Sequence, residues 1–282
     1  MDTGEPVVPS RRLGRELRRL RDVSGHTQVQ VAKHVGTAST TISKIETGER
    51  NAPIPHLKLM LQLYQVAPGH AKALVRLAEQ ARQPGWWMAH RDDVPHWFIE
   101  YVGLESEAEQ VWTYEQGYFP GLLQTERYTE AVTVAANTAE TSESAQGVAR
   151  VRATRQLRLR GAKPVVLRAV IDEAVLHRQV GGPDVMREQV VRLRQAMSQP
   201  NITVQIMPFS LGAHPGQTGP FTVLRYSERS MNMVYVEVRG GSVYLDRSKD
   251  IDIHEVVFEE LSRLALSEDD TASLLSEMER KY

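Results

Sequence analysis

The sequence predicts a two-domain protein, in which an all-α domain of five helices precedes an α+β domain with a mainly antiparallel sheet. The chain has 282 residues, more than the ~100–200 typical of one domain. Short segments with helical apolar spacing fill the chain as far as residue 82, whereas runs rich in β-branched residues begin after Pro164. We place a flexible polar arm at residues 1–9 and the domains at 10–82 and 83–282.

The stretch QPGWWMAHRDDVPHW (83–97) marks the expected boundary near Gln83. It brings three of the four Trp residues together with Pro and Gly. Such an abrupt change of composition between periodic segments is typical of a junction between domains.

Charge divides unevenly between the two predicted domains. Residues 1–82 contain 13 Lys and Arg against 7 Asp and Glu, whereas the rest of the chain contains 21 against 28. A basic surface attracts polyanions, which favours the first domain as a nucleic-acid-binding side. A merely solvated basic surface is the alternative.

The absence of Cys excludes disulfides, thiolate metal sites and a Cys nucleophile. The first residues lack an apolar leader segment, and no run approaches the ~18 apolar residues of a membrane span. We therefore expect a cytoplasmic protein that does not contact a membrane.

Apolar spacing predicts five helices in the first domain. We expect Ser10 to cap the first helix, Gly25 to end it, and Thr27 to cap the second, which Gly36 ends. The remaining three are expected over about Ser39 to Thr47, from Pro55 onward, and from Pro68 to Arg82.

The second and third of these helices carry the pattern of a helix-turn-helix. Ala32 is small where two helices cross closely, and Gly36 supplies the positive φ of a tight turn. Ile42 and Ile45 are expected to face inward. Small hydroxyl side chains and Lys44 then occupy the face that enters the major groove in this motif.

The stretch resembles the phage-repressor, xenobiotic-response-element (XRE) type of helix-turn-helix family over residues 10–80. The match covers Thr27, Gln28, Ala32, Gly36, Ser39, Ile42, Ser43, Ile45, Glu46, Gly48 and Arg50. The resemblance implies that Ser39, Thr40 and Lys44 meet base edges, while Gln28, Ser43 and Arg50 hold phosphates. The full set of expected DNA contacts is Gln28, Thr37, Ser39, Thr40, Ser43, Lys44 and Arg50. Solvated hydroxyls on a protein-interaction domain, with Thr27 and Ser39 acting only as caps, are the alternative.

The second domain is expected to mix helices and strands. We predict helices at 107–114, from 125 to about Asn137, at 150–160, 183–199, 250–266 and 268–280, with a polar loop at 136–147. Strands are predicted at 165–171, 202–209, 221–226, 233–239 and 243–247, the last two joined through Gly240-Gly241. Ser267 is expected to cap the last helix.

The polar candidates for chemistry in this domain form no recognisable catalytic motif. They are Asp172, Glu173, His177, His214, Glu237 and Asp246. A His with carboxylates is able in principle to act as a general acid-base pair or a metal site. Without a recognised motif, a loop role for His214 and capping or charge-neutralising roles for Asp172 and Glu173 are favoured. We therefore expect no enzyme, no cofactor and no metal.

Aromatic residues cluster near the start of the second domain, namely Trp86, Trp87, Trp97, Phe98, Tyr101 and Trp112. They are expected either to line a ligand pocket or to form core or an interdomain seam. The loops PGLLQT (120–125) and GAHPG (212–216) are further places to hold a partner. The candidate ligand or partner residues are Trp86, Trp87, Trp97, Gln124 and His214.

Residues 83–275 resemble the C-terminal domain of WhiJ-like actinobacterial regulators. The resemblance is carried, in order, by WWMAHRDDVPHWFIEYVGLESEA, YFPGLLQTERY, RQLRLRG, IDEAVLHRQVGGPDVMREQ, NITVQIMPF, GAHPG and GPFTVLRY. It implies a streptomycete-type transcription factor, from a family encoded beside small partner proteins and described as antitoxin-like.

Together these features predict a homodimeric, sequence-specific regulator of double-stranded DNA. Its C-terminal domain would dimerise and receive a small partner protein or a small-molecule effector. The alternatives are an antitoxin-like protein that sequesters a small partner, and a DNA-targeted enzyme that uses His214 with Asp172 or Glu173.

Overall fold

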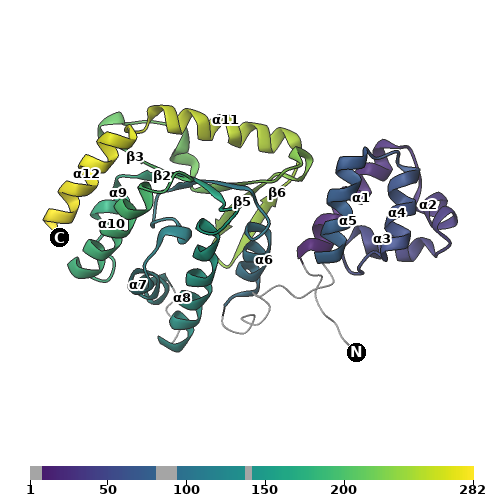
Figure 1. Cartoon of the computed structure of the whole chain (residues 1–282), viewed down its shortest axis with the longest axis horizontal. Coiled ribbons are helices and arrows are strands. Elements are labelled where there is room, and N and C mark those ends of the chain that lie inside the picture. The colour runs from purple at the N-terminus through teal and green to yellow at the C-terminus, as the bar shows by residue number, and fades with distance from the viewer. Residues whose placement is uncertain (1–7, 81–93, 137–141) are drawn as a thin grey trace. The chain divides into compact units, whose positions relative to one another are not determined.

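The structure, a computed structural model, describes residues 8–80, 94–136 and 142–282 (Figure 1). These residues form two compact units, one on each side of residues 81–93. The expected boundary at Gln83 and most of the expected arm lie outside the described residues. None of the described helices is both long and apolar enough to span a bilayer.

The first unit is the predicted five-helix domain. Its helices are α1 (Val8–Val23), α2 (Gln28–Val35), α3 (Ser39–Glu46), α4 (Ile54–Leu63) and α5 (Pro68–Gln80). Their inward residues form one core, with Leu13, Leu17, Val31, Ile42, Ile45, Leu57, Met60 and Leu74 all buried. Apolar periodicity predicted this architecture correctly because each helix buries one stripe of side chains.

The start of α1 differs from the prediction. The helix begins at Val8 and therefore includes Ser10, which was expected to cap it. Ser10 is buried, and its hydroxyl donates to the side-chain oxygen of Asn51. Pro9 stands in the first turn, where a missing backbone N–H costs nothing.

The second unit is built on a six-stranded mixed sheet. Its strands are β1 (Gln110–Glu115), β2 (Val166–Asp172), β3 (Ile202–Met207), β4 (Phe221–Arg225), β5 (Met233–Val238) and β6 (Gly241–Leu245). Their order is β3-β2-β1-β4-β5-β6. The pairs β1–β4, β4–β5 and β5–β6 are antiparallel, whereas β1–β2 and β2–β3 are parallel. The sheet is therefore mainly antiparallel, as predicted.

Helices cover both faces of this sheet. The helices are α6 (His96–Glu105), α7 (Glu126–Ala136), α8 (Ser142–Gln156), α9 (Ala174–His177), α10 (Pro183–Met197), α11 (Ser248–Leu264) and α12 (Glu268–Lys281). Figure 1 shows α11 along one face and α6, α7 and α8 on the other. Under α11, Trp112 and Tyr114 of β1 join a core with Phe258 and Leu261. Because strand side chains alternate, Thr113 and Glu115 face the α6–α8 side.

Two predictions in this unit were wrong. The helix expected at 107–114 is instead a turn leading into β1, in which Val111, Trp112, Thr113 and Tyr114 are all buried. These β-branched and aromatic residues suit a central strand, and their tertiary contacts override the helical appearance of the preceding segment. The polar loop expected at 136–147 is helical from Ser142 onward.

The two late local predictions were correct. Gly240 has φ 80° in the turn between β5 and β6, a conformation that glycine adopts without strain. Ser267 caps α12, with its hydroxyl oxygen accepting a hydrogen bond from the backbone N–H of Asp270 at 3.1 Å.

Candidate functional site

The α2–α3 pair has the local geometry of a helix-turn-helix. Thr27 starts α2 with a capping box, in which its hydroxyl accepts from the Gln30 N–H at 3.2 Å and its own N–H donates to the Gln30 side chain at 2.8 Å. Gly36 ends α2 in the left-handed region with φ 77°, and its N–H donates to the Ala32 carbonyl. The short turn that follows places α3 across α2.

Packing fixes α3 against the rest of the unit. Ala32, Val35, Ile42 and Ile45 are buried between the helices, and the inward positions of Ile42 and Ile45 agree with the sequence prediction. A feature that the sequence reasoning missed is Gly14 of α1, where an added Cβ would lie 2.3 Å from the Ile45 carbonyl oxygen. Close packing against α1 and α2 therefore holds the inner side of α3, and the outer face of α3 is directed to solvent.

The expected base and phosphate contacts lie on that outer face. Thr40, Lys44 and Arg50 are exposed, and the side chains of Gln28, Thr37, Ser39 and Ser43 are partly exposed. Across the described residues, no hydrogen bond or ion pair involves the side chain of Thr37, Ser39, Thr40, Ser43, Lys44 or Arg50. The N-cap of α3 is Ala38, so Ser39 is not a cap. These groups are free to meet a ligand from solvent.

The Gln28 side chain already uses one of its two amide hydrogens in a hydrogen bond. Its Nε2 donates to Glu46 Oε2 at 2.8 Å. The buried Glu46 carboxylate also accepts from Arg21 Nε at 2.6 Å, and Arg21 Nη1 donates to the His26 carbonyl at 3.0 Å. The hydrogen bond to Glu46 raises the pKa of Arg21.

This network ties the end of α1 and the start of α2 to the end of α3. An amide nitrogen carries two hydrogens, so Gln28 retains one N–H for a phosphate. The sequence reasoning placed Glu46 in the motif without a role. A buried acid beside Ile45 was the signal that it needs a basic partner.

The acid and histidine candidates of the second unit form two pairs. His214 Nε2 lies 3.9 Å from Asp172 Oδ2, and His177 Nε2 lies 3.1 Å from Glu173 Oε1. Backbone groups hold the same side chains, because His214 Nδ1 accepts from the Gly216 N–H at 3.2 Å and Asp172 Oδ1 accepts from the Ala174 N–H at 2.9 Å.

Glu173 Oε2 likewise accepts from the Phe209 N–H at 2.8 Å. Because Nδ1 of His214 is an acceptor, the neutral ring carries its proton on Nε2, towards Asp172. The four side chains thus shape the loops at the carboxyl ends of β2 and β3. The described residues contain no group of three or more His, Asp or Glu placed to hold a metal ion.

The predicted aromatic cluster is divided by the sheet. Trp112 stacks on Phe258 under α11 with ring centroids 5.3 Å apart, whereas Tyr101 packs on Tyr235 at 4.3 Å on the opposite face. Trp97 belongs to α6 beside Phe98. Trp86 and Trp87 lie outside the described residues. The prediction of a single pocket lined by both Trp112 and Tyr101 is therefore wrong.

Gln124 is buried at the end of the PGLLQT loop rather than exposed to a partner. Its Nε2 donates to the Phe119 carbonyl at 2.6 Å, and its Oε1 accepts from Thr129 at 3.1 Å and from Arg152. His214 is on the α11 side of the sheet, packed edge-on against Tyr114. The two loop candidates therefore belong to different faces.

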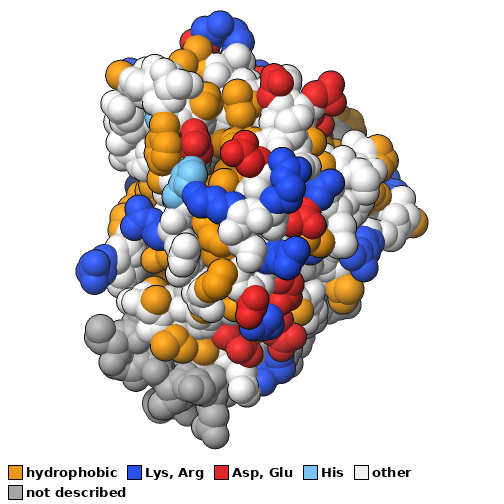
Figure 2. Space-filling view, turned by 90° about the vertical axis from the view of Figure 1, so that its left-hand side faces the viewer, with side chains coloured by type: hydrophobic (Ala, Val, Ile, Leu, Met, Phe, Trp, Pro, Cys, Tyr) orange, Lys and Arg blue, Asp and Glu red, His pale blue; other side chains and the backbone are white. Residues whose placement is uncertain are grey.

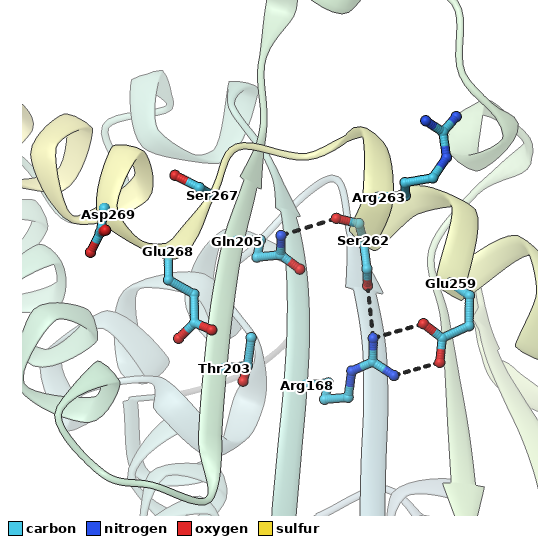
Figure 3. Close-up of a pocket in the computed structure, with 9 residues that line it drawn as sticks. All are labelled: Arg168, Thr203, Gln205, Glu259, Ser262, Arg263, Ser267, Glu268 and Asp269. Carbon is cyan, nitrogen blue, oxygen red and sulfur yellow. Dashed lines mark hydrogen bonds and ion pairs between the residues drawn. The ribbon is translucent and has the colours of Figure 1, made fainter.

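A polar hollow of about 550 Å³, which the sequence did not predict, lies where α11 turns into α12 (Figure 3). Arg168 of β2 donates to both carboxylate oxygens of Glu259, at 2.7 and 2.9 Å, and Gln205 of β3 donates to the Ser262 carbonyl at 3.0 Å. These contacts tie α11 to the sheet.

Figure 2 shows Lys and Arg side chains interspersed with Asp and Glu on one face of the molecule.

The geometry of α2 and α3 agrees with a family match. Residues 12–74 match a helix-turn-helix domain, and the chain is thus of the class of DNA-binding regulators. Residues 98–277 match a domain of unknown function, DUF5753, and this match spans more than half of the chain. The chain belongs to the DUF5753 family. No curated protein and no solved structure gives a significant match.

Proposed function

We propose that the protein is a sequence-specific transcription regulator of the XRE type, related to the WhiJ-like regulators of actinobacteria and acting in the cytoplasm. The observation that carries this proposal is the outer face of α3, where Lys44 stands exposed among short hydroxyl side chains. Short side chains let the helix backbone approach the floor of the major groove, and a lysine there donates to guanine acceptors. With hydroxyls at the other positions, water and DNA shape contribute to specificity.

A single helix-turn-helix reaches one half-site, so we propose that the protein acts as a homodimer. Two-fold symmetric regulators bind half-sites about one helical turn apart, and doubling the contacts raises both affinity and specificity. The second unit would supply the dimer contacts and receive a signal, either a small protein encoded nearby or a small molecule. Such a signal acts only if it binds the DNA-competent and incompetent states with different affinities.

The decisive experiment recovers genomic DNA bound to the full-length protein and identifies proteins that co-purify in the same sample. A recurrent motif of two related half-sites, with a sedimentation mass of two chains, supports the proposal. Bound DNA without any shared motif overturns sequence-specific recognition. A stoichiometric complex with a small protein that alters operator affinity would make the antitoxin-like alternative the better description.

A further inference from the structure

Five side chains of the second unit form a polar cluster on the sheet face that α6, α7 and α8 cover. They are Glu115 of β1, Tyr128 of α7, Arg152 of α8, and Tyr235 and Glu237 of β5. We call this set the switch-point cluster. None of these residues takes part in the proposed DNA contacts.

The strand register brings the two carboxylates to the same end of the sheet. Thr113 of β1 and Tyr235 of β5 both pair with Thr222 of β4. Since β1 and β5 run in the same direction on either side of β4, Glu115 and Glu237 each lie two residues beyond that row. They also share its face, because side chains alternate along a strand.

The strand order reverses at β1, which lies between β2 on one side and β4 on the other. From β1 the chain proceeds to β2 and β3 on one side, whereas β4, β5 and β6 lie on the other. In open, mostly parallel α/β sheets, ligands bind outside the carboxyl ends of the strands at such a switch point, and the β1–β2–β3 half of this mixed sheet is parallel. Glu115 is the last residue of β1 and is thus at that position.

The charged groups of the cluster are near one another but unpaired. No ion pair within 4.0 Å joins Arg152 to Glu115 or Glu237 among the described residues. Arg152 Nη1 donates to Gln124, but its buried Nε has no hydrogen-bond partner in the part of the chain that the structure describes. Among the described residues, Glu115 accepts a hydrogen bond only from the Thr113 hydroxyl, at 3.1 Å.

The neighbouring arginine shows what a satisfied pair looks like in the same region. One helical turn further along α8, Arg155 Nε donates to Glu105 Oε1 at 2.8 Å, and its Nη2 meets Glu105 Oε2 at 2.5 Å. Both of those side chains are buried and are balanced by one another. The switch-point cluster lacks this internal neutralisation, which costs stability unless another group supplies the partners.

The buried tyrosine hydroxyls and the shifted pKa values of the cluster agree with its lack of internal neutralisation. Tyr128 is fully buried and Tyr235 is 6% exposed, and neither hydroxyl makes a hydrogen bond of ordinary geometry within the described chain, although the Phe119 backbone lies near the first and the Glu237 carboxylate near the second. Burial raises the pKa of Glu115 to about 7, and burial followed by repulsion from Arg155 lowers the pKa of Arg152 to about 10. Convergent polar groups with shifted pKa values beside aromatic side chains are a feature of candidate binding sites.

The charges define what would fit. A simple anion at Arg152 would stand beside two carboxylates, and a simple amine at Glu115 or Glu237 would leave Arg152 Nε unpaired. A ligand with both an ammonium and a carboxylate satisfies both sides at once. Glu237 is exposed, and Glu115 and Arg152 are partly exposed, so a ligand is able to reach these three side chains from solvent, whereas Arg152 Nε and the two tyrosine hydroxyls are buried atoms.

We infer that the switch-point cluster binds a free α-amino acid, with its carboxylate on Arg152 and its ammonium between Glu115 and Glu237. This inference rests on the proposed regulatory function and assigns a ligand class to its signal-receiving unit. The Arg152 guanidinium carbon lies 5.8 Å from the Phe98 ring centroid, so an aromatic ring borders the cluster.

Calorimetric titration of the full-length protein at pH 8, without DNA, tests the inference. Each proteinogenic α-amino acid is used as a separate probe, with ethylamine and acetate as single-charge probes. We expect one or a few amino acids to bind at least tenfold more tightly than either single-charge probe. Since DNA is absent, failure here is distinguishable from failure to bind an operator.

Variants locate the site. Glu115→Gln and Arg152→Gln each remove one charge and should weaken binding at least tenfold, while Glu109→Gln makes the same acid-to-amide change at the other end of β1 and should leave it unchanged. Circular dichroism checks that each variant is folded; if Arg152→Gln unfolds, Glu115→Gln and Glu237→Gln decide. Absence of binding by every amino acid, equal binding of ethylamine or acetate, or undiminished binding by folded Glu115→Gln overturns the inference.

Discussion

Gly14 of α1 lies directly against the backbone of Ile45 in α3, so that a Cβ at residue 14 would come within 2.3 Å of the Ile45 carbonyl oxygen. Alanine would gain about 1 kcal/mol of helix propensity over glycine. A backbone oxygen cannot rotate away as a flexible side chain does, and overpacking of this kind costs typically 1–3 kcal/mol or more. We expect Gly14→Ala to destabilise the first unit by about 2 kcal/mol and to lower its Tm in calorimetry.

The matched control is Gly117→Ala, because a Cβ at Gly117 meets nothing within 4 Å. Its effect should stay within about 0.5 kcal/mol, as for an ordinary surface substitution. An unchanged Tm for Gly14→Ala would show that α1 and α3 are able to move apart and would contradict the close packing described above.

Glu46→Ala should be more damaging than any change on the outer face of α3. It leaves Arg21 without the carboxylate at 2.6 Å and releases the Gln28 amide. Arg21 is 12% exposed and keeps the Asp22 carboxylate at 2.7 Å, so the hydrogen bonds left unmade should cost about 1–3 kcal/mol. Urea unfolding measures this loss, and Glu49→Ala, at an exposed acid three residues away, should cost less than about 1 kcal/mol. Equal losses of unfolding free energy in the two variants would show that the Glu46 network adds no more stability than an exposed acid does.

The helix-turn-helix was predictable because its signals are local. Thr27 and Gly36 are cap residues whose chemistry acts within a few neighbours, and Ile42 and Ile45 follow the helical period. Gly14 was not recognised, because the reason for a glycine there is a backbone 31 residues away in the sequence. The role of Glu46 was missed for the same reason, because its partner Arg21 lies in another helix.

In the second unit, too, the features that the sequence did not predict depend on residues far apart in the chain. The helix predicted at 107–114 was wrong because burial of Gln110–Glu115 in the centre of the sheet, rather than its local sequence, decides its conformation. The position of Glu115 and Glu237 at the same end and on the same face of the sheet depends on strand order, which periodicity does not specify. His214 and Asp172 were predicted as candidates, and their 3.9 Å approach could not have been deduced from their separation in sequence.

Lys44→Ala should reduce the preference for the operator more than it weakens binding to random DNA. Loss of a good base contact costs about 1–3 kcal/mol of discrimination. Titration of both DNAs at a fixed salt concentration gives the two affinities. Lys33→Ala, at an exposed lysine of α2, removes the same charge away from the predicted groove face and should preserve the ratio. Equal losses on both DNAs for Lys44→Ala would reject base reading by this side chain.

Arg50→Ala should weaken operator and random DNA alike, because a phosphate contact carries no sequence information. The slope of log affinity against log salt should fall by about 0.9 if Arg50 neutralises one phosphate. Affinities measured at several salt concentrations give this slope for the variant and the parent protein. A slope identical to that of the parent would remove Arg50 from the interface.

The stability of the second unit should depend on the protonation of Glu115. Its pKa is raised from 4.5 to about 7 by burial, opposed by the Thr113 hydroxyl and by Arg152 and reinforced by Glu237. A folded state that holds its proton more tightly than the unfolded chain loses stability as pH rises from the unfolded to the folded pKa. The parent protein should therefore lose up to about 3 kcal/mol from this group between pH 4.5 and 7, at 1.36 kcal/mol per pKa unit.

Glu115→Gln removes this loss because the amide stays neutral. Urea unfolding at pH 5 should give similar free energies for the variant and the parent, whereas at pH 8 the variant should be the more stable of the two. Glu109→Gln, at an exposed acid, should follow the parent at both values of pH. A Glu115→Gln variant that is less stable than the parent at pH 8 would mean that the ionised carboxylate has a partner, and the cluster would then be a satisfied structural network.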